Sequence, residues 1–271
     1  MRLRLVVLAL AFAASACTEP APEPPPQPPV QFDRVSADAL AHGKRLADVL
    51  GCVGCHGDDM TGKDWSDPAL GRLWTANLSR SVPLYSDAQL SAVIRGGARP
   101  DRELWDMPSH LFTQLSSSDM GALIAYLRSH KPAGVVHPPP TFEEPLRKKI
   151  ADGTYLSSRA QVKKEGSVSP PDVGPGHDLA RYVVRSTCAE CHGMDLRGGK
   201  PDFGGQVRPD LRIAAAYDLA AFKRLMRTGI AAGNRELKLM SEVARGRYAH
   251  FTDAEVEALH RYLQRVAEVA P

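Results

Sequence analysis

Cys52-Val53-Gly54-Cys55-His56 recurs 136 positions later as Cys188-Ala189-Glu190-Cys191-His192, and these two stretches decide the fold. In each of them the two cysteines are three residues apart, so both sulfurs lie on one face of a helical turn. A histidine follows directly, which is the pattern of c-type haem attachment. The two sulfurs can form thioethers to one porphyrin, and the histidine can bind its iron. The sequence therefore predicts two haem c groups, attached through Cys52, Cys55, Cys188 and Cys191, with His56 and His192 as iron ligands.

Two other uses of paired cysteines fit this sequence less well. A thioredoxin-like redox pair belongs to a βαβ pattern, and neither pair is surrounded by one. Pairs that share a structural zinc ion usually lie about 12 to 20 residues apart, whereas these two pairs lie 136 positions apart. The fifth cysteine, Cys17, falls near the N-terminus, so no cysteine remains for a structural disulfide.

The first residues have the features of an export signal. Arg2 and Arg4 precede a short apolar stretch at residues 5–13, which is too short for a mature membrane-spanning helix of about 20 residues. The sequence Ala14-Ser15-Ala16-Cys17 resembles the lipobox of bacterial lipoproteins, in which the cysteine is lipidated. Cleavage after the last alanine by ordinary signal peptidase is the alternative.

We therefore expect residues 1–17 to be a signal peptide that ends at a lipidated Cys17. Residues 18–32 are rich in proline and should form an extended tether. Together these two segments predict an exported, periplasmic protein that a lipid anchor holds to a bacterial membrane.

An internal repeat surrounds the cysteine motifs. Residues 115–127 and 250–263 resemble each other, and both start with a Ser/Thr and Asp capping signal before apolar residues at helical spacing. Each half should therefore end in an amphipathic helix. We predict two tandem domains, residues 33–130 and 173–271, joined by a linker at residues 131–172. Further matches at the same offset of 136 are Arg45 with Arg181, Asp59 with Asp195, Gly62 with Gly198 and Tyr126 with Tyr262.

A methionine stands at a matching place in each half. With the offset shortened to 133, Arg102-Glu103-Leu104 and Met107 align with Arg235-Glu236-Leu237 and Met240. The methionines follow their motif histidines by 51 and 48 residues and precede the terminal helix. Methionine in general is more often core filler. His110 lies three residues beyond the first methionine and could replace it as a ligand.

Each half resembles a class I c-type cytochrome domain, in which a few helices wrap around one covalently bound haem. This resemblance implies an all-α fold. It implies that Met107 and Met240 are the sixth iron ligands. It also implies that a proline carbonyl orients the proximal histidine, a role that Pro209 suits in the second half. The first half has Ala76 at the corresponding place, so we expect another group, such as Pro68, to orient His56.

The whole chain resembles dihaem cytochromes c that take electrons from periplasmic dehydrogenases. The resemblance implies electron transfer, with no catalytic residue, between such a donor and a respiratory oxidase or a soluble cytochrome. Dihaem enzymes of the peroxidase or thiosulfate dehydrogenase type remain the alternative, because they also carry two such motifs but need one open haem position.

The charge of the chain bears on its partners. The formal net charge of +3 falls to +1 without the leader, so nucleic acid is not an obvious partner. Residues 33–130 carry a net charge of −2 and residues 173–271 a net charge of +3. This difference fits either distinct redox partners for the two halves or ordinary surface scatter.

Overall fold

The structure is a computed structural model that describes residues 30–200 and 206–269. The expected signal peptide, Cys17 and residues 18–29 of the expected tether lie outside the described residues. Within the described residues no helix is both long enough and apolar enough to pass through a membrane. The described elements are mostly helices, with only two short antiparallel ladders, so the prediction of an all-α fold is confirmed apart from these ladders.

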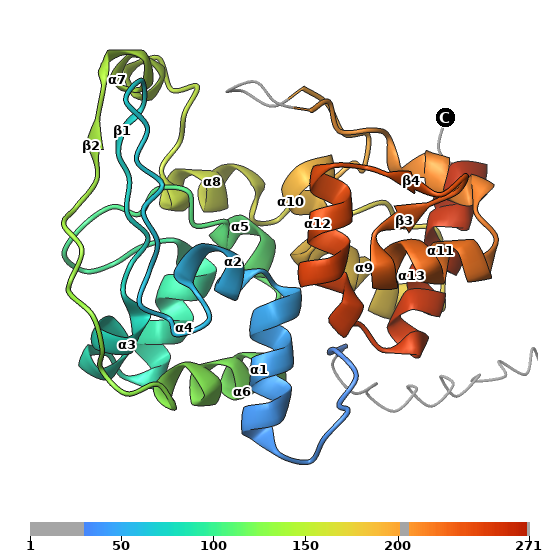
Figure 1. The fold of residues 1–271 in the computed structure, drawn as a ribbon, viewed down its shortest axis with the longest axis horizontal. Helices are drawn as coiled ribbons and strands as arrows, with labels where there is room; N and C mark the ends of the chain where they lie inside the picture. The colour runs from blue at the N-terminus through green and yellow to red at the C-terminus, as the bar shows by residue number, and fades with distance from the viewer. Residues whose placement is uncertain (1–29, 201–205, 270–271) are drawn as a thin grey trace, which may run out of the picture.

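The first half runs from α1 to α6 (Figure 1). Good capping residues fix the ends of its helices: Asp38 caps α1, Ser86 forms a capping box with Gln89 at α4, and Ser116 caps α6. Gly97 ends α4 at a φ of 64°, which favours glycine. The elements are α1 (Ala39–Val49), α2 (Cys52–His56), β1 (Gly71–Arg72), α3 (Leu78–Ser81), η1 (Val82–Leu84), α4 (Asp87–Gly96), α5 (Ser109–Phe112) and α6 (Ser117–Arg128).

The second half likewise begins with a helix that leads into a short motif helix, and it ends with a long helix. Its first and last helices, α9 and α13, pack together as α1 and α6 do in the first half. The elements are α9 (Asp178–Ser186), α10 (Ala189–His192), η2 (Leu211–Ala216), α11 (Leu219–Thr228), β3 (Ile230–Ala231), β4 (Arg235–Glu236), α12 (Leu239–Gly246), η3 (Tyr248–His250) and α13 (Asp253–Val269). β3 and β4 form an antiparallel ladder that pairs Ile230 with Glu236.

The connecting segment, residues 131–172, packs against the first half. It contains β2 (Thr141–Phe142), α7 (Glu144–Ala151) and α8 (Ser158–Glu165). β2 pairs with β1, and α8 packs against α5 and α4. Figure 1 shows α7 with β1 and β2 at the end of the molecule that lies away from the second half. The segment thus wraps around the first half.

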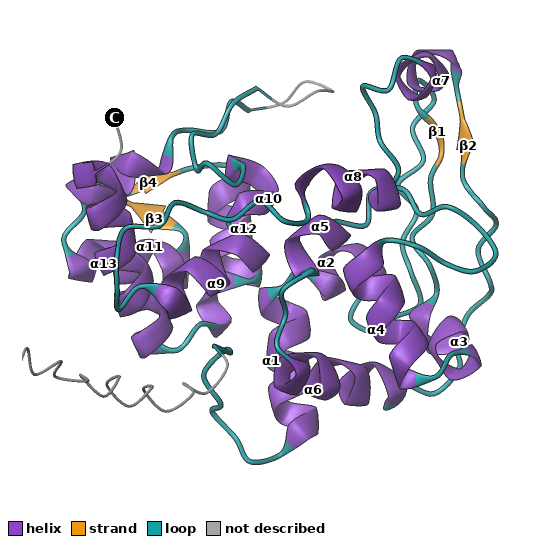
Figure 2. Ribbon diagram, turned by 180° about the vertical axis from the view of Figure 1, so that it is seen from behind, coloured by secondary structure: helices purple, strands orange, loops and turns teal. Residues whose placement is uncertain are grey.

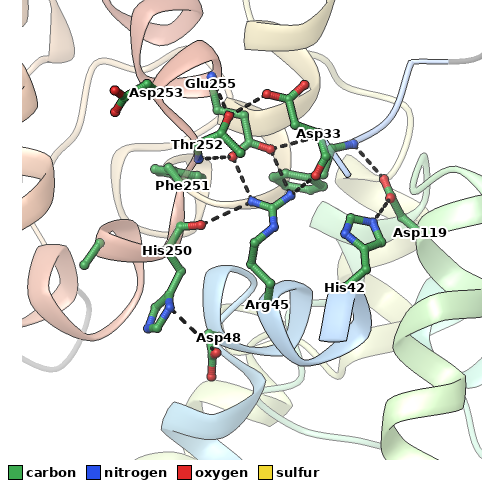
Figure 3. A network of polar contacts seen from close by, with 12 residues as sticks. Asp33, His42, Arg45, Asp48, Asp119, His250, Phe251, Thr252, Asp253 and Glu255 are labelled. Atoms are coloured by element: carbon green, nitrogen blue, oxygen red, sulfur yellow. Dashed lines mark hydrogen bonds and ion pairs between the residues drawn. The ribbon is translucent and has the colours of Figure 1, made fainter. Parts of the chain in front are cut away.

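The two halves lie side by side, as Figure 2 shows from behind, and a buried polar network joins them. Arg45 of α1 forms an ion pair with Glu255 of α13 at 2.9 Å, and the two side chains are 8% and 0% exposed. Arg45 also donates to the carbonyls of Asp33 and His250 (Figure 3). In the opposite direction, Tyr182 of α9 donates to Asp119 of α6 at 2.7 Å. The contact between the halves is therefore reciprocal.

The segment before α1 lies within this contact. Phe32 is fully buried and meets the ring of Tyr182 edge to face, with ring centroids 5.4 Å apart. Its backbone N–H donates to Asp119, whereas the backbone N–H of Asp33 donates to Glu255. Two successive residues thus bond to the terminal helices of different halves.

Candidate haem sites

The cysteines and the histidine of each motif lie on a single helical turn. In the first half, α2 contains all three residues, and in the second half Cys188 is the N-cap of α10. The glycine after each histidine has nearly the same backbone conformation, with φ and ψ of 80° and 160° at Gly57 and of 75° and 164° at Gly193. A positive φ lets the chain leave the helix abruptly, because glycine has no Cβ to clash. The chain therefore leaves both motif helices and enters the following loops in the same way.

The loops that follow the motifs share their hydrogen bonds. The N–H of Gly62 donates to the carbonyl of His56 at 2.8 Å, and that of Gly198 donates to His192 at 2.9 Å. Met60 and Leu196, at equivalent positions, both adopt a positive φ, of 57° and 61°. The sequence repeat is thus also a repeat of backbone geometry.

A backbone carbonyl orients each motif histidine. His192 Nδ1 lies 2.8 Å from the carbonyl oxygen of Pro209, and His56 Nδ1 lies 2.9 Å from that of Ala76. A carbonyl only accepts, so each Nδ1 donates a proton and the lone pair of each ring is on Nε2. The contact of Pro209 is as expected, whereas the suggestion that Pro68 orients His56 is wrong. The carbonyl of Ala76 orients His56 instead. Every residue has a backbone carbonyl, so this role does not need a proline.

Burial favours the neutral form of both imidazoles. It lowers the pKa of His56, and the hydrogen bond to the Ala76 carbonyl opposes this shift only in part. Burial likewise lowers the pKa of His192, against the opposing effect of Pro209. A metal binds the neutral imidazole, so both rings are in the form and the tautomer that suit an iron ligand through Nε2.

Polar side chains that the sequence reasoning missed also support the first motif. Thr75 Oγ1 donates to the carbonyl of Cys55 at 2.7 Å, and Lys63 Nζ donates to that of Gly54 at 2.9 Å. Both groups satisfy carbonyls at the end of the short helix α2. Neither residue has a distinctive sequence signal, because many loops contain isolated Thr and Lys residues.

Met107 is half-buried and packs against the core. Its neighbour Asp106 has a φ of 58° and makes a side-chain hydrogen bond with Tyr155 of the connecting segment. Trp105 stacks on the same tyrosine with ring centroids 5.5 Å apart, and the N–H of Ser158 donates to the carbonyl of Leu104. The connecting segment therefore supports the Met107 loop.

Met240 is also half-buried against the core, but it lies in the first turn of α12. Ser241 beside it is fully buried, and its hydroxyl donates to the carbonyl of Gly229 while accepting from the N–H of Leu237. The second methionine is thus positioned by a helix and the buried Ser241, whereas the first lies in a loop that the connecting segment supports.

His110 lies in α5, and burial lowers its pKa. Its Nδ1 is buried without a hydrogen-bond partner among the described residues, and its Nε2 lies 4.0 Å from Glu165. Its carbonyl accepts from Arg185 of α9 at 2.9 Å. His110 therefore lies at the junction of the first half, the connecting segment and the second half.

The donor set of each half fits a haem c. Two thiols three residues apart share a helical turn, a neutral imidazole offers Nε2, and a half-buried thioether comes from a separate loop or helix. Burial raises the pKa of the Cys52 thiol to about 12. Cysteine sulfurs can bond to a porphyrin, and a soft methionine sulfur can bind its iron.

Comparison with protein families gives the same result. The family model for cytochrome c matches residues 40–131 and, separately, residues 179–267. A comparison with curated protein sequences finds no match. The two matched regions each contain one motif, its oriented histidine and the terminal helix, so the resemblance read from the sequence is confirmed. The chain belongs to the cytochrome c family, with two tandem domains, and is a haem-binding electron-transfer protein.

Proposed function

We propose that this chain is a dihaem electron carrier in which each domain holds one haem c between a histidine and a methionine. The domains extend over residues 33–130 and 173–271, and residues 131–172 connect them. The observation that carries the proposal is the duplicated proximal geometry. His56 and His192 both direct Nδ1 to a backbone carbonyl, which leaves Nε2 of each ring for iron.

Met107 and Met240 complete the two sites as sixth ligands. When bound, each haem supplies a one-electron couple between ferric and ferrous iron. A neutral, soft methionine sulfur favours the reduced form. A histidine and a methionine together leave no open position for a substrate, so the residues of this chain support electron exchange and no bond chemistry.

The N-terminal sequence supports an exported protein. We propose that it is periplasmic, that Cys17 carries the lipid anchor, and that the proline-rich tether at residues 18–32 holds the first domain away from the membrane. Its partners are then a periplasmic dehydrogenase or a similar donor and a respiratory oxidase or soluble cytochrome. The net charges of the halves, −2 and +3, give each domain a different field for such partners.

The test is haem counting together with ligand spectroscopy on the full-length holoprotein. We expect two haems per chain in the pyridine haemochrome assay. We also expect the weak red absorption band that ferric haem shows when methionine sulfur binds iron. The variants Met107→Ala and Met240→Ala should each remove about half of this band. Met120→Ala, which changes a buried methionine of α6, is the matched control and should retain it.

Two results would contradict the proposal. A band unchanged in both variants would show that the methionines are not ligands. Rapid turnover of peroxide by the wild-type protein would show an accessible iron position and would favour the dihaem enzyme.

A further inference from the structure

Arg247 of the second domain contacts the second haem-attachment motif and the residues just before the first. It lies between α12 and η3. Its Nη1 donates to Glu190 Oε2 at 2.6 Å, and Glu190 stands between the two cysteines of the second motif. Its Nε donates to the carbonyl of Val49 at 3.2 Å, three residues before the first cysteine of the first motif. One guanidinium group thus joins the segment just before the first motif to the middle of the second.

The first domain leaves room for this side chain. Gly51 directly precedes the first motif and has a φ of 82°. A Cβ built on Gly51 would lie 2.6 Å from Cζ of Arg247, closer than real contacts allow. The guanidinium therefore packs directly against the backbone at Gly51, and a side chain at this position would have to displace it.

The hydrogen bonds of Arg247 do not satisfy all of the donors of its buried side chain. Its side chain is only 15% exposed, and its Nη2 is buried without a hydrogen-bond partner among the described residues. An unpaired buried donor costs stability. Figures 1 and 2 show α2 on the side of the first half that faces the second half, which agrees with the contact across the domains.

The Arg247–Glu190 pair lies beside both motifs. Glu190 stands between Cys188 and Cys191 of the second motif, and the guanidinium of Arg247 packs against Gly51, which directly precedes Cys52. Both charges of the pair are therefore close to the first motif as well as to the second.

We propose that Arg247 and Glu190 form a shared electrostatic element of the two haem sites. The pair links the second attachment motif to the residues just before the first, and each of its charges acts on both haems: Arg247 raises both potentials and Glu190 lowers both. This inference rests on the proposed dihaem function. Arg247 and Glu190 are positioning residues, because they act through the motifs and are not iron ligands.

The direction of each effect follows from the charges. A haem gains positive charge when it is oxidised, so a nearby cation disfavours the oxidised form and raises the potential, whereas a nearby carboxylate lowers it. In a partly buried site these effects extend further than in water. The two charges of the pair oppose each other, so removing either one alone should expose the effect of the other.

The test is a spectroelectrochemical titration of the full-length holoprotein that resolves both haem potentials. Arg247→Gln should lower both midpoint potentials, and Glu190→Gln should raise both. The double variant should lie between the two single variants. Arg245→Gln and Glu236→Gln are the matched controls, because they remove an exposed pair of the same domain, 3.1 Å apart, and should shift neither potential.

Three results would overturn the inference. The first is a shift in only one of the two potentials, and the second is an equal shift in the control variants. The third is a loss of thermal stability with both potentials unchanged, which would indicate a purely structural pair. Haem counting is done on every sample: a wild type with one haem refutes the dihaem function itself, whereas two haems with unmoved potentials refute only this inference. If Arg247→Gln does not retain both haems, Glu190→Gln provides the test, because that side chain is 34% exposed.

Discussion

The carboxylate of Glu255 accepts hydrogen bonds from both domains. Within its own helix it accepts from the N–H of Thr252 at 2.8 Å, as in a capping box. Across the contact it accepts from the N–H of Asp33 and from the guanidinium of Arg45. The side chain is fully buried, so its charge depends on these partners. Loss of one partner from a buried pair leaves an uncompensated charge, which is costly.

Replacement of Arg45 by alanine should therefore destabilise the protein. For Arg45→Ala we expect the free energy of unfolding to fall by about 3 to 5 kcal/mol. Urea unfolding of the holoprotein, followed by far-ultraviolet circular dichroism, measures this change. The matched control is Arg181→Ala, at the equivalent position of α9, because Arg181 pairs with the largely exposed Asp172. The control should cost about 0 to 1 kcal/mol, and equal losses in the two variants would contradict the argument.

Arg45 and Arg181 also show how much the sequence could predict about single residues. The repeat correctly paired their positions, but it could not show that one forms a buried bond over 210 residues and the other a surface pair. Such long-range pairing leaves no local pattern. The same holds for Ala76, whose carbonyl orients His56 although its side chain has no part in the contact.

The crossing of α1 and α6 depends on a glycine. A Cβ built on Gly43 of α1 would lie 2.0 Å from the carbonyl oxygen of Ala122 in α6. The two backbones thus approach too closely for any side chain at this point. This crossing positions α2 and the first motif, because α2 follows α1 after only a short turn.

Gly43→Ala should force the two helices apart. Overpacking of this kind costs about 1 to 3 kcal/mol, and thermal unfolding of the holoprotein should show the loss as a lower melting temperature. Gly121→Ala in α6 is the control, because its added Cβ meets nothing within 4 Å. There we expect a gain of up to about 1 kcal/mol, since alanine favours a helix more than glycine does. A neutral Gly43→Ala would show that the crossing can relax.

Elements with strong periodic patterns were predicted, and those that depend on tertiary contacts were not. Helices α6 and α13 follow capping signals and apolar spacing that are visible in the sequence. Helices α7 and α8 in the connecting segment are only eight residues each. Helices this short are marginal alone, and α8 is held by packing against α5, which no local pattern could reveal.

At the scale of the whole molecule, Phe32 lies at the contact of the two domains. It is fully buried between Tyr182 of the second domain, at 5.4 Å, and Arg45 of the first, whose guanidinium lies 5.9 Å from its ring centroid. The contact combines the rings of Phe32 and Tyr182 with the buried ion pair of Arg45 and Glu255. It should therefore make the domains unfold together.

Phe32→Ala should weaken this coupling. Removal of a buried phenylalanine side chain costs about 3 to 5 kcal/mol, and most of this loss should fall on the contact between the domains. We expect one calorimetric unfolding transition in the wild-type holoprotein and two separate transitions in the variant. Val35→Ala, which changes a side chain that is 61% exposed, should retain the single transition. A single transition in Phe32→Ala would show that the domains are coupled by other contacts.

The hydrogen bonds of residues 32 and 33 also bear on when this segment can fold during synthesis. Their backbone groups bond to Asp119 and Glu255, which lie 87 and 222 residues further along the chain. These early residues leave the ribosome before their last partner has been translated. Contacts between residues so distant in sequence form slowly. The hydrogen bonds of this segment can therefore be complete only when the second domain is present, because Glu255 belongs to its terminal helix.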